Sequence, residues 1–376
     1  MWLALRRAAN ELFKAVTAPR ARGRHTVRAD QPAAWDRLHR SYREDGIVLV
    51  LGSGVSFDSR LPNWETLVER LAADRAPEVG KALFDRLRRS GLSLPVIASV
   101  IEERSGSRAK FVERVRDALY SEFPFYRAGV GGDDRKRFLD HVECDNKTLR
   151  AVAALCVCGD KGGAYSPNGQ IRAVISLNLD QLLQKYIRAR YRRRLLRTIE
   201  SPSASSSAKR IGIYHIHGFL RFDRKARIKP KEGAYAMVLT EQDYFNVYND
   251  PLSVFNYTFM YHLRESACLF VGLSMQDENV RRLLHFSKME RLRGYKNEGR
   301  RVVRDERLLR HFAILKRNDC PEVDDAIEES LRPLGTTALW IEDYPEIPSR
   351  LQSLYGDGWP LVYDRPNTAL QDDRQR

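Results

Sequence analysis

The chain has 376 residues, a hydrophobic fraction of 43%, a charged fraction of 30% and a formal net charge of +15. These values are typical of a soluble globular protein with one large core and room for a second module. Apolar runs stay short of the ~20 residues that a membrane-spanning helix needs, and Arg6-Arg7 interrupt the apolar start. The composition therefore excludes a membrane span and argues against a secretory signal. Five scattered cysteines indicate free thiols in a reducing cytoplasm.

The first forty residues predict a separate amphipathic and basic arm. Apolar residues recur at helical spacing from Trp2 to Val16, and residues 20–24 are basic. Packing against the parent domain or a partner subunit is the preferred use of this arm, over a targeting peptide or contact with anionic lipid. The predicted divisions are an arm at 1–40, a main domain at 41–364 and a disordered tail at 365–376.

A strand pattern followed by a glycine turn is the first functional signal along the chain. The apolar residues 47–51 run into Gly52-Ser53-Gly54-Val55-Ser56, and a helical pattern begins at Asn63. Because Gly52 and Gly54 have no Cβ atom, backbone N–H groups there can approach a pyrophosphate, and a helix start adds partial positive charge. A tight turn without a ligand is the equally weighted alternative for this segment on its own.

Helical periods dominate the chain between this turn and the next strand pattern. They cover residues 79–87, 94–101, 111–120 and 138–157. We expect a helical insertion at about 75–170 that either closes over a nucleotide pocket or provides an oligomer surface.

Three later apolar segments end in polar residues. They are 173–180, which ends in Asn178-Leu179-Asp180, then 214–218, which ends in His217-Gly218, and 268–277, which contains Gly272-Leu273-Ser274. Ligands of open parallel sheets bind just outside the carboxyl ends of the strands, so all these ends can meet at one crevice. The predicted fold is therefore an α/β, Rossmann-like parallel sheet. Residues 311–315 and 337–341 predict further strands, and residues 346–354 predict a final helix.

Taken in order, these segments resemble the sirtuin (silent-information-regulator-like) family of NAD-binding proteins. The glycine turn resembles the family's phosphate loop, and Leu61-Pro62-Asn63-Trp64 stands where the family has an aromatic lid over the nicotinamide ribose. His217-Gly218 resembles the family's catalytic His-Gly pair. The resemblance implies NAD-binding roles for Gly52, Ser53, Gly54, Ser56, Trp64, Asp180, Gly272 and Ser274, and catalytic roles for His217 and Asn178.

The departures from the family concern zinc and the pocket. Protein-deacylating sirtuins usually hold a structural zinc on two Cys-x-x-Cys pairs, and this sequence has no such pair, so we expect neither a zinc ribbon nor another metal. Leu177 replaces the family's Gln, and Glu65 stands where an Arg usually follows the aromatic residue. These departures, and the form of residues 272–277, resemble the sirtuin-like effectors of bacterial antiphage defence, which hydrolyse NAD.

The chemistry of NAD cleavage suits the residues at these strand ends. Breaking the bond between ribose and nicotinamide passes through an oxocarbenium-like state, so the enzyme must hold the ribose and position water. We interpret His217 as a general base and Asn178 as the group that positions water or ribose, while Asp180 can bind the carboxamide. His215 is the lesser candidate base. Residues two apart on a strand face the same side, so spacing does not separate the two histidines, and His217 is preferred for the Gly218 that follows it and for the family match.

Structural roles are open for several of the same residues. Asn178 and Asp180 suit the cap of a helix starting near residue 181, and Asp277 suits the cap of the next helix, where the structural role is favoured. Trp64 fits a core position as well as a lid.

The segment 185–197 predicts a basic helix that leads to a serine-rich loop at 201–207. A solvated face is favoured there over nucleic-acid contact. The resemblance implies an NAD glycohydrolase that depletes NAD in antiphage defence and works as a homo-oligomer. Because unregulated NAD hydrolysis would be lethal, we also expect a regulatory partner or assembly to control it. The alternatives are an NAD-dependent protein deacylase or ADP-ribosyltransferase, and a non-catalytic module that senses NAD or ADP-ribose.

Overall fold

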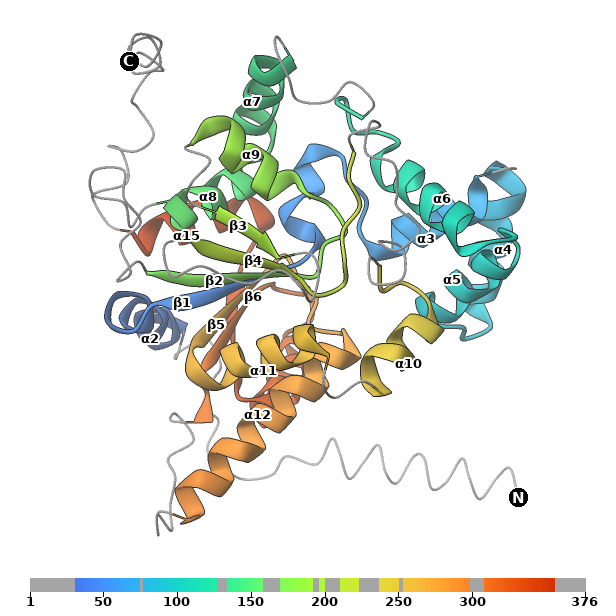
Figure 1. Ribbon diagram of the computed structural model, residues 1–376. Helices are drawn as coiled ribbons and strands as arrows, with labels where there is room; N and C mark the ends of the chain where they lie inside the picture. The colour runs from blue at the N-terminus through green and yellow to red at the C-terminus, as the bar shows by residue number, and fades with distance from the viewer. Residues whose placement is uncertain are drawn as a thin grey trace, which may run out of the picture.

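A seven-stranded sheet lies at the centre of the protein, with helices on both of its faces (Figure 1). The computed structural model describes residues 31–74, 77–126, 134–157, 170–191, 196–199, 210–222, 237–249, 253–297 and 308–355. The strand order is β3-β4-β2-β1-β5-β6-β7, and each neighbouring pair is parallel. This arrangement confirms the predicted Rossmann-like α/β fold.

The strands are β1 (Ile47–Leu51), β2 (Ile171–Ser176), β3 (Leu196–Ile199), β4 (Ile211–His215), β5 (Ala267–Val271), β6 (His311–Lys316) and β7 (Thr336–Ile341). β1 and β5 are buried along their whole length, which explains why they are continuous apolar runs without alternation. From β1 at the centre, the strand order runs through β2 and β4 to β3 at one edge, and through β5 and β6 to β7 at the other edge. The crevice where ligands bind in such sheets therefore lies beyond the carboxyl ends of β1, β2 and β5.

The helices are α2 (Gln31–Glu44), α3 (Trp64–Ala73), α4 (Pro77–Arg89), α5 (Leu94–Glu103), α6 (Arg108–Tyr120), α7 (Asp134–Asp145), α8 (Lys147–Val157), α9 (Leu182–Arg190), α10 (Glu241–Asn249), α11 (Val254–Glu265), α12 (Glu278–Asn297), α14 (Pro321–Leu331) and α15 (Ile347–Ser353). Helices α4, α5 and α6 confirm three of the helical periods predicted between β1 and β2. They gather beside α3 and α10, to one side of the sheet (Figure 1).

The fourth helical period, at 138–157, is two helices and not one. α7 ends before Asn146, whose side-chain oxygen accepts a hydrogen bond of 2.8 Å from the N–H of Leu149 and so caps α8. Asn146 is fully buried, and the break lets its side chain turn toward the glycine turn after β1.

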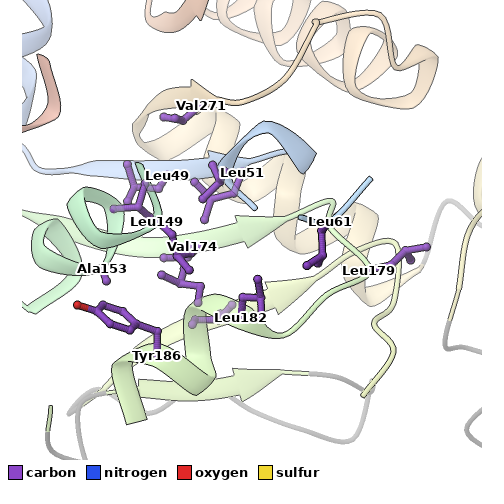
Figure 2. Packing of buried hydrophobic residues seen from close by; sticks show 14 of the residues in the cluster. Leu49, Leu51, Leu61, Leu149, Ala153, Val174, Leu179, Leu182, Tyr186 and Val271 are labelled. Atoms are coloured by element: carbon purple, nitrogen blue, oxygen red, sulfur yellow. The ribbon is translucent and has the colours of Figure 1, made fainter. Parts of the chain in front are cut away.

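Each face of the sheet buries its own apolar layer. Leu49 and Val174 belong to the layer that also contains residues of α8 and α9, and Figure 2 shows them beside Leu149, Leu182 and Tyr186. Val48 and Val50 point to the opposite layer, which includes residues of α11 and α12. Alternation along β1 thus fixes the sheet between two helical layers.

One predicted segment differs from the structure. The basic helix predicted to reach residue 197 ends at Arg190, and residues 196–199 form β3, which pairs with β4. Leu196 and Ile199 are buried in β3, and this apolar burial outweighs the helical pattern. The predicted arm overlaps α2, whose Trp35 and Leu38 are buried in the core. Residues 1–30, 201–207 and 365–376 lie outside the described residues.

The strands predicted at 311–315 and 337–341 are confirmed as β6 and β7, and the final helix as α15. Within the described ranges, each helix is too short or too polar to cross a bilayer.

Candidate functional site

The glycine turn after β1 packs directly on the turn after β5. A Cβ on Gly54 would lie 2.8 Å from Cα of Gly272, and a Cβ on Gly272 would lie 2.7 Å from the nitrogen of Val55. Gly272 also has a φ of +68°, which L side chains adopt rarely. The N–H groups of Gly52 and Gly54 donate to the carbonyls of Val271 and Gly272, at 3.0 and 3.1 Å. These glycines therefore join two loops, and their own N–H groups bind protein carbonyls.

Two buried polar residues hold this turn from the other side. Asn146 donates to the carbonyl of Val55 at 3.0 Å and to the hydroxyl of Ser59 at 2.9 Å. Ser56, which is 2% exposed, donates a hydrogen bond to the carboxylate of Asp180. Sequence analysis missed Asn146, because it stands inside the single helical period predicted at 138–157, where a cap is not expected.

Asp180 caps α9, as predicted for one of its two alternative roles. Its Oδ1 accepts a hydrogen bond of 2.8 Å from the N–H of Leu182. Burial raises the pKa of Asp180 above its ordinary value, even though Ser56 and Leu182 donate to it. Asp180 thus ties the start of α9 to the turn after β1.

Asn178 lies at the end of β2, two residues before Asp180, and is 8% exposed. Its N–H donates to the hydroxyl of Ser176 at 3.2 Å, and its carbonyl lies 3.4 Å from Nδ1 of His215. These backbone contacts fix the position of Asn178, and the hydrogen bond that caps α9 comes from Asp180.

His215, the lesser candidate base, is occupied on both ring nitrogens. Its Nε2 lies 2.6 Å from Nε2 of Gln184, and its Nδ1 faces the carbonyl of Asn178. A neutral ring that donates from Nδ1 and accepts at Nε2 satisfies both contacts. Burial lowers the pKa of His215 to about 4. His215 is therefore a neutral histidine that connects β4 to α9.

His217 does not share a face with His215, because β4 ends at His215 and the chain turns. Gly218 has a φ of +76°, and the carbonyl of His217 accepts from the N–H of Val238 at 2.9 Å. The positive φ explains why glycine follows this histidine. The expectation that both rings point the same way is wrong, since strand alternation stops before His217.

The ring of His217 is 4% exposed, and its Nε2 has no hydrogen-bond partner among the described residues. This nitrogen lies 3.9 Å from Oδ2 of Asp277. Burial lowers the pKa of His217, and the Asp277 carboxylate opposes that shift. The imidazole is therefore neutral near pH 7 and holds a ring nitrogen that can take a proton.

Tyr244 lies beside both His217 and Asp277, and sequence analysis missed it. Its hydroxyl donates to Oδ2 of Asp277 at 2.9 Å, and its ring lies edge-on to His217 at 5.9 Å between centroids. Burial and Asp277 raise the pKa of Tyr244, so it remains a donor. Oδ1 of Asp277 accepts from the N–H of Val280 at 2.8 Å, which confirms Asp277 as the cap of α12.

Helix α10 carries Tyr244 and is anchored to the helices between β1 and β2. Asp243 accepts from the N–H groups of Leu239 and Thr240 at 3.1 and 2.9 Å. Arg108, at the start of α6, donates to Asp243 and to Glu102, both at 2.8 Å. The position of Tyr244 is thus linked to α5 and α6 through the guanidinium group of Arg108, and to α5 also through Ser99, whose hydroxyl accepts from the N–H of Glu241 at 3.1 Å.

The other predicted site residues are more peripheral. Trp64 is partly buried and packs against the apolar layer that contains Leu49, which fits the core interpretation. Ser274 is exposed and precedes Met275, whose φ of 60° strains the loop. In the part of the chain that the structure describes, His, Cys, Asp and Glu side chains form no group of three or more that could hold a metal.

One comparison with known proteins finds a family for part of the chain. Residues 172–334 match the model of the SIR2-like domain family. The matched segment contains Asn178, His217, Gly272 and Asp277, while the turn after β1 precedes it. No curated protein matches the chain significantly. SIR2-like domains generally serve NAD-dependent reactions, which gives the chain an NAD-related function. Residues 172–334 therefore match a SIR2-like domain, which supports a sirtuin-like family for this part of the chain.

Proposed function

We propose that this protein is an NAD glycohydrolase that releases nicotinamide and ADP-ribose. The observation that carries the proposal is the buried, neutral His217, whose Nε2 is unpartnered among the described residues and lies 3.9 Å from the Asp277 carboxylate. A histidine of this kind is suited to accept a proton in the transition state. The SIR2-like domain supports NAD as the substrate.

In this mechanism the bond from the ribose C1′ to the nicotinamide nitrogen breaks as the oxygen of water bonds to C1′. Nicotinamide leaves as a neutral molecule and takes the bonding electron pair, so no strong acid is needed. His217 accepts the proton that water loses, and the Asp277 carboxylate stabilises the imidazolium that forms. Asn178 positions the water or the ribose from the end of β2.

The cellular role we propose is depletion of NAD in antiphage defence. Uncontrolled hydrolysis would consume the cell's own NAD, so we infer that a regulatory partner or assembly into a homo-oligomer controls the enzyme.

The direct test is incubation of purified protein with NAD, with and without nucleic-acid activators, followed by chromatography of the products. Equal amounts of nicotinamide and ADP-ribose support the proposal. Acylated ADP-ribose in the presence of an acetylated peptide identifies a deacylase. NAD that binds but is not consumed under any condition identifies a sensor and contradicts the hydrolase.

The pH dependence tests the role assigned to His217. Burial lowers the pKa of His217 below 6.5, so the neutral base persists into mild acid and kcat/KM should fall only below pH 6.5. Asp277→Asn removes the carboxylate that raises the pKa of His217. The fall of kcat/KM at acid pH should therefore move to lower pH, while the maximal kcat/KM declines. A pH–rate profile of both proteins measures this. A limb that moves to higher pH in Asp277→Asn contradicts the assignment.

Arg108→Met should lower kcat by about tenfold to a hundredfold with little change in KM, because Tyr244 loses the anchor of its helix. The matched control is Arg104→Met, since Arg104 is an exposed arginine at the end of α5. Arg108→Lys keeps the charge and should recover part of the rate. Steady-state kinetics measure the effect. Equal kcat values in wild type and Arg108→Met would show that the anchor does not serve the reaction.

A further inference from the structure

A second cluster of buried polar side chains lies at the amino ends of β6 and β7, whereas His217 lies beyond the carboxyl end of β4. His311 and Thr336 are the first residues of these strands and are direct partners in the parallel pairing. Ser287 and Arg291 lie four residues apart on α12, on the helix face that the sheet covers. We call these four residues the α12–β6–β7 cluster.

Several observations bring Arg291, His311 and Thr336 together, and Ser287 lies one turn before Arg291 on the same helix. Nη2 of Arg291 lies 3.1 Å from the position that a Cβ on Gly335 would take, and Gly335 precedes Thr336. The charge of Arg291 acts on the ring of His311. His311 and Thr336 are 0% exposed, and Ser287 is 1% exposed. Three of the four side chains are therefore enclosed between α12 and the starts of two strands, and Arg291 is half-buried.

The cluster has an excess of hydrogen-bond donors. Nδ1 of His311 accepts from the N–H of Cys268 at 3.2 Å, so its Nε2 carries the proton. That Nε2, the Nε and Nη2 of Arg291, the hydroxyl of Ser287 and the hydroxyl of Thr336 are buried and have no partner among the described residues. Three of these five atoms can only donate. Buried polar groups almost always have partners, so the arrangement calls for an acceptor.

The cluster also has uncompensated positive charge. Burial and the nearby charge of Arg310 lower the pKa of Arg291 to about 10, while Tyr295 and Cys268 oppose that shift. Burial, Arg291 and Arg310 hold the pKa of His311 well below its ordinary value. Within the described ranges, no carboxylate forms an ion pair with Arg291. A cation whose Nε and Nη2 are buried without a counter-charge is costly.

We propose that the α12–β6–β7 cluster binds a small inorganic anion. An anion accepts from each of the three N–H groups and from both hydroxyls, and it neutralises Arg291 in the same step. Water can accept hydrogen bonds from some of these groups, but it also donates and would itself need acceptors. Water carries no charge and cannot neutralise Arg291. The site lies at the amino ends of the strands, away from His217, so it serves the stability of the sheet and of α12.

The test is thermal unfolding of the full-length protein at fixed ionic strength, with chloride, bromide, sulfate or phosphate replacing a large organic anion. The melting temperature of wild type should rise by about 3–6 °C at a hundredfold excess over the dissociation constant. Arg291→Met should lose this rise. Arg293→Met should keep it, because Arg293 is an exposed residue of the same helix, paired with Glu290 at 2.6 Å. Arg291→Gln serves as a second variant if the Met variant does not fold.

Crystals grown with bromide and with phosphate distinguish the kind of anion. An anomalous bromide peak beside Arg291 and His311 supports a halide, and tetrahedral density supports an oxyanion. Equal anion responses in wild type and Arg291→Met, or water alone in the cluster at saturating anion, would overturn the proposal. Neither readout involves NAD, so the result is independent of the proposed hydrolase activity.

Discussion

His217→Ala should reduce nicotinamide release from NAD by about 10²- to 10⁴-fold, the usual contribution of a general base. The reason is that Nε2 of His217 is the buried ring nitrogen that lies beside Asp277 and is free to accept a proton, whereas both nitrogens of His215 are engaged. The initial rate of nicotinamide release, measured at a pH of about 7.5, gives the result.

The matched control is His285→Ala, which removes an exposed histidine from α12 and should leave the rate unchanged. Because His217 is buried, its truncation also leaves a cavity, so the unfolding temperature of each variant must be measured. His217→Gln retains hydrogen-bonding atoms without a basic nitrogen and should be as inactive as the alanine variant. A folded His217→Ala protein with the wild-type rate would exclude His217 as the base.

Gly272→Ala should lower the free energy of unfolding by about 2–5 kcal/mol, the sum of a strained backbone and an overpacked contact. Its φ is +68°, and the new methyl group would lie 2.7 Å from the nitrogen of Val55. The turn after β1 would have to move away from the turn after β5. Urea unfolding measures the loss, and the rate of NAD cleavage should fall with it.

Gly106→Ala serves as the control that separates the cost of a left-handed backbone from the cost of a Cβ that is too close to its neighbours. Gly106 has a φ of +76°, similar to that of Gly272, but a Cβ there would meet nothing within 4 Å. We expect it to lose only about 1–2 kcal/mol, the cost of the left-handed backbone. Equal losses in the two variants would show that the contact between the two turns does not contribute to stability.

The sequence was sufficient to predict the parts of the site that depend on chain-local patterns. An apolar run that ends in a glycine or a cap residue specifies a strand, a turn and the next helix, and a parallel sheet brings such ends to one edge. Asp180 and Asp277 illustrate this, since both cap the helices that follow them, as predicted. The functional roles of the site residues remain predictions.

Residues that act through distant contacts could not be predicted in the same way. Tyr244 lies on α10, a helix without a fully buried residue, so its apolar pattern carries little signal. Its position depends on Arg108, 136 positions earlier in the chain, and on Asp277, which follows on another helix. β3 was missed because its four residues directly follow a strongly basic segment that resembles a helix.

The contact between Gly54 and Gly272 limits how this protein can be redesigned. Each residue already has the smallest possible side chain, and each backbone occupies the space that a Cβ on the other would need. A larger residue at either position therefore cannot be relieved by a smaller one at the other. Under the proposed function, a change of nucleotide preference has to come from side chains around these two turns, while the pair itself stays unchanged.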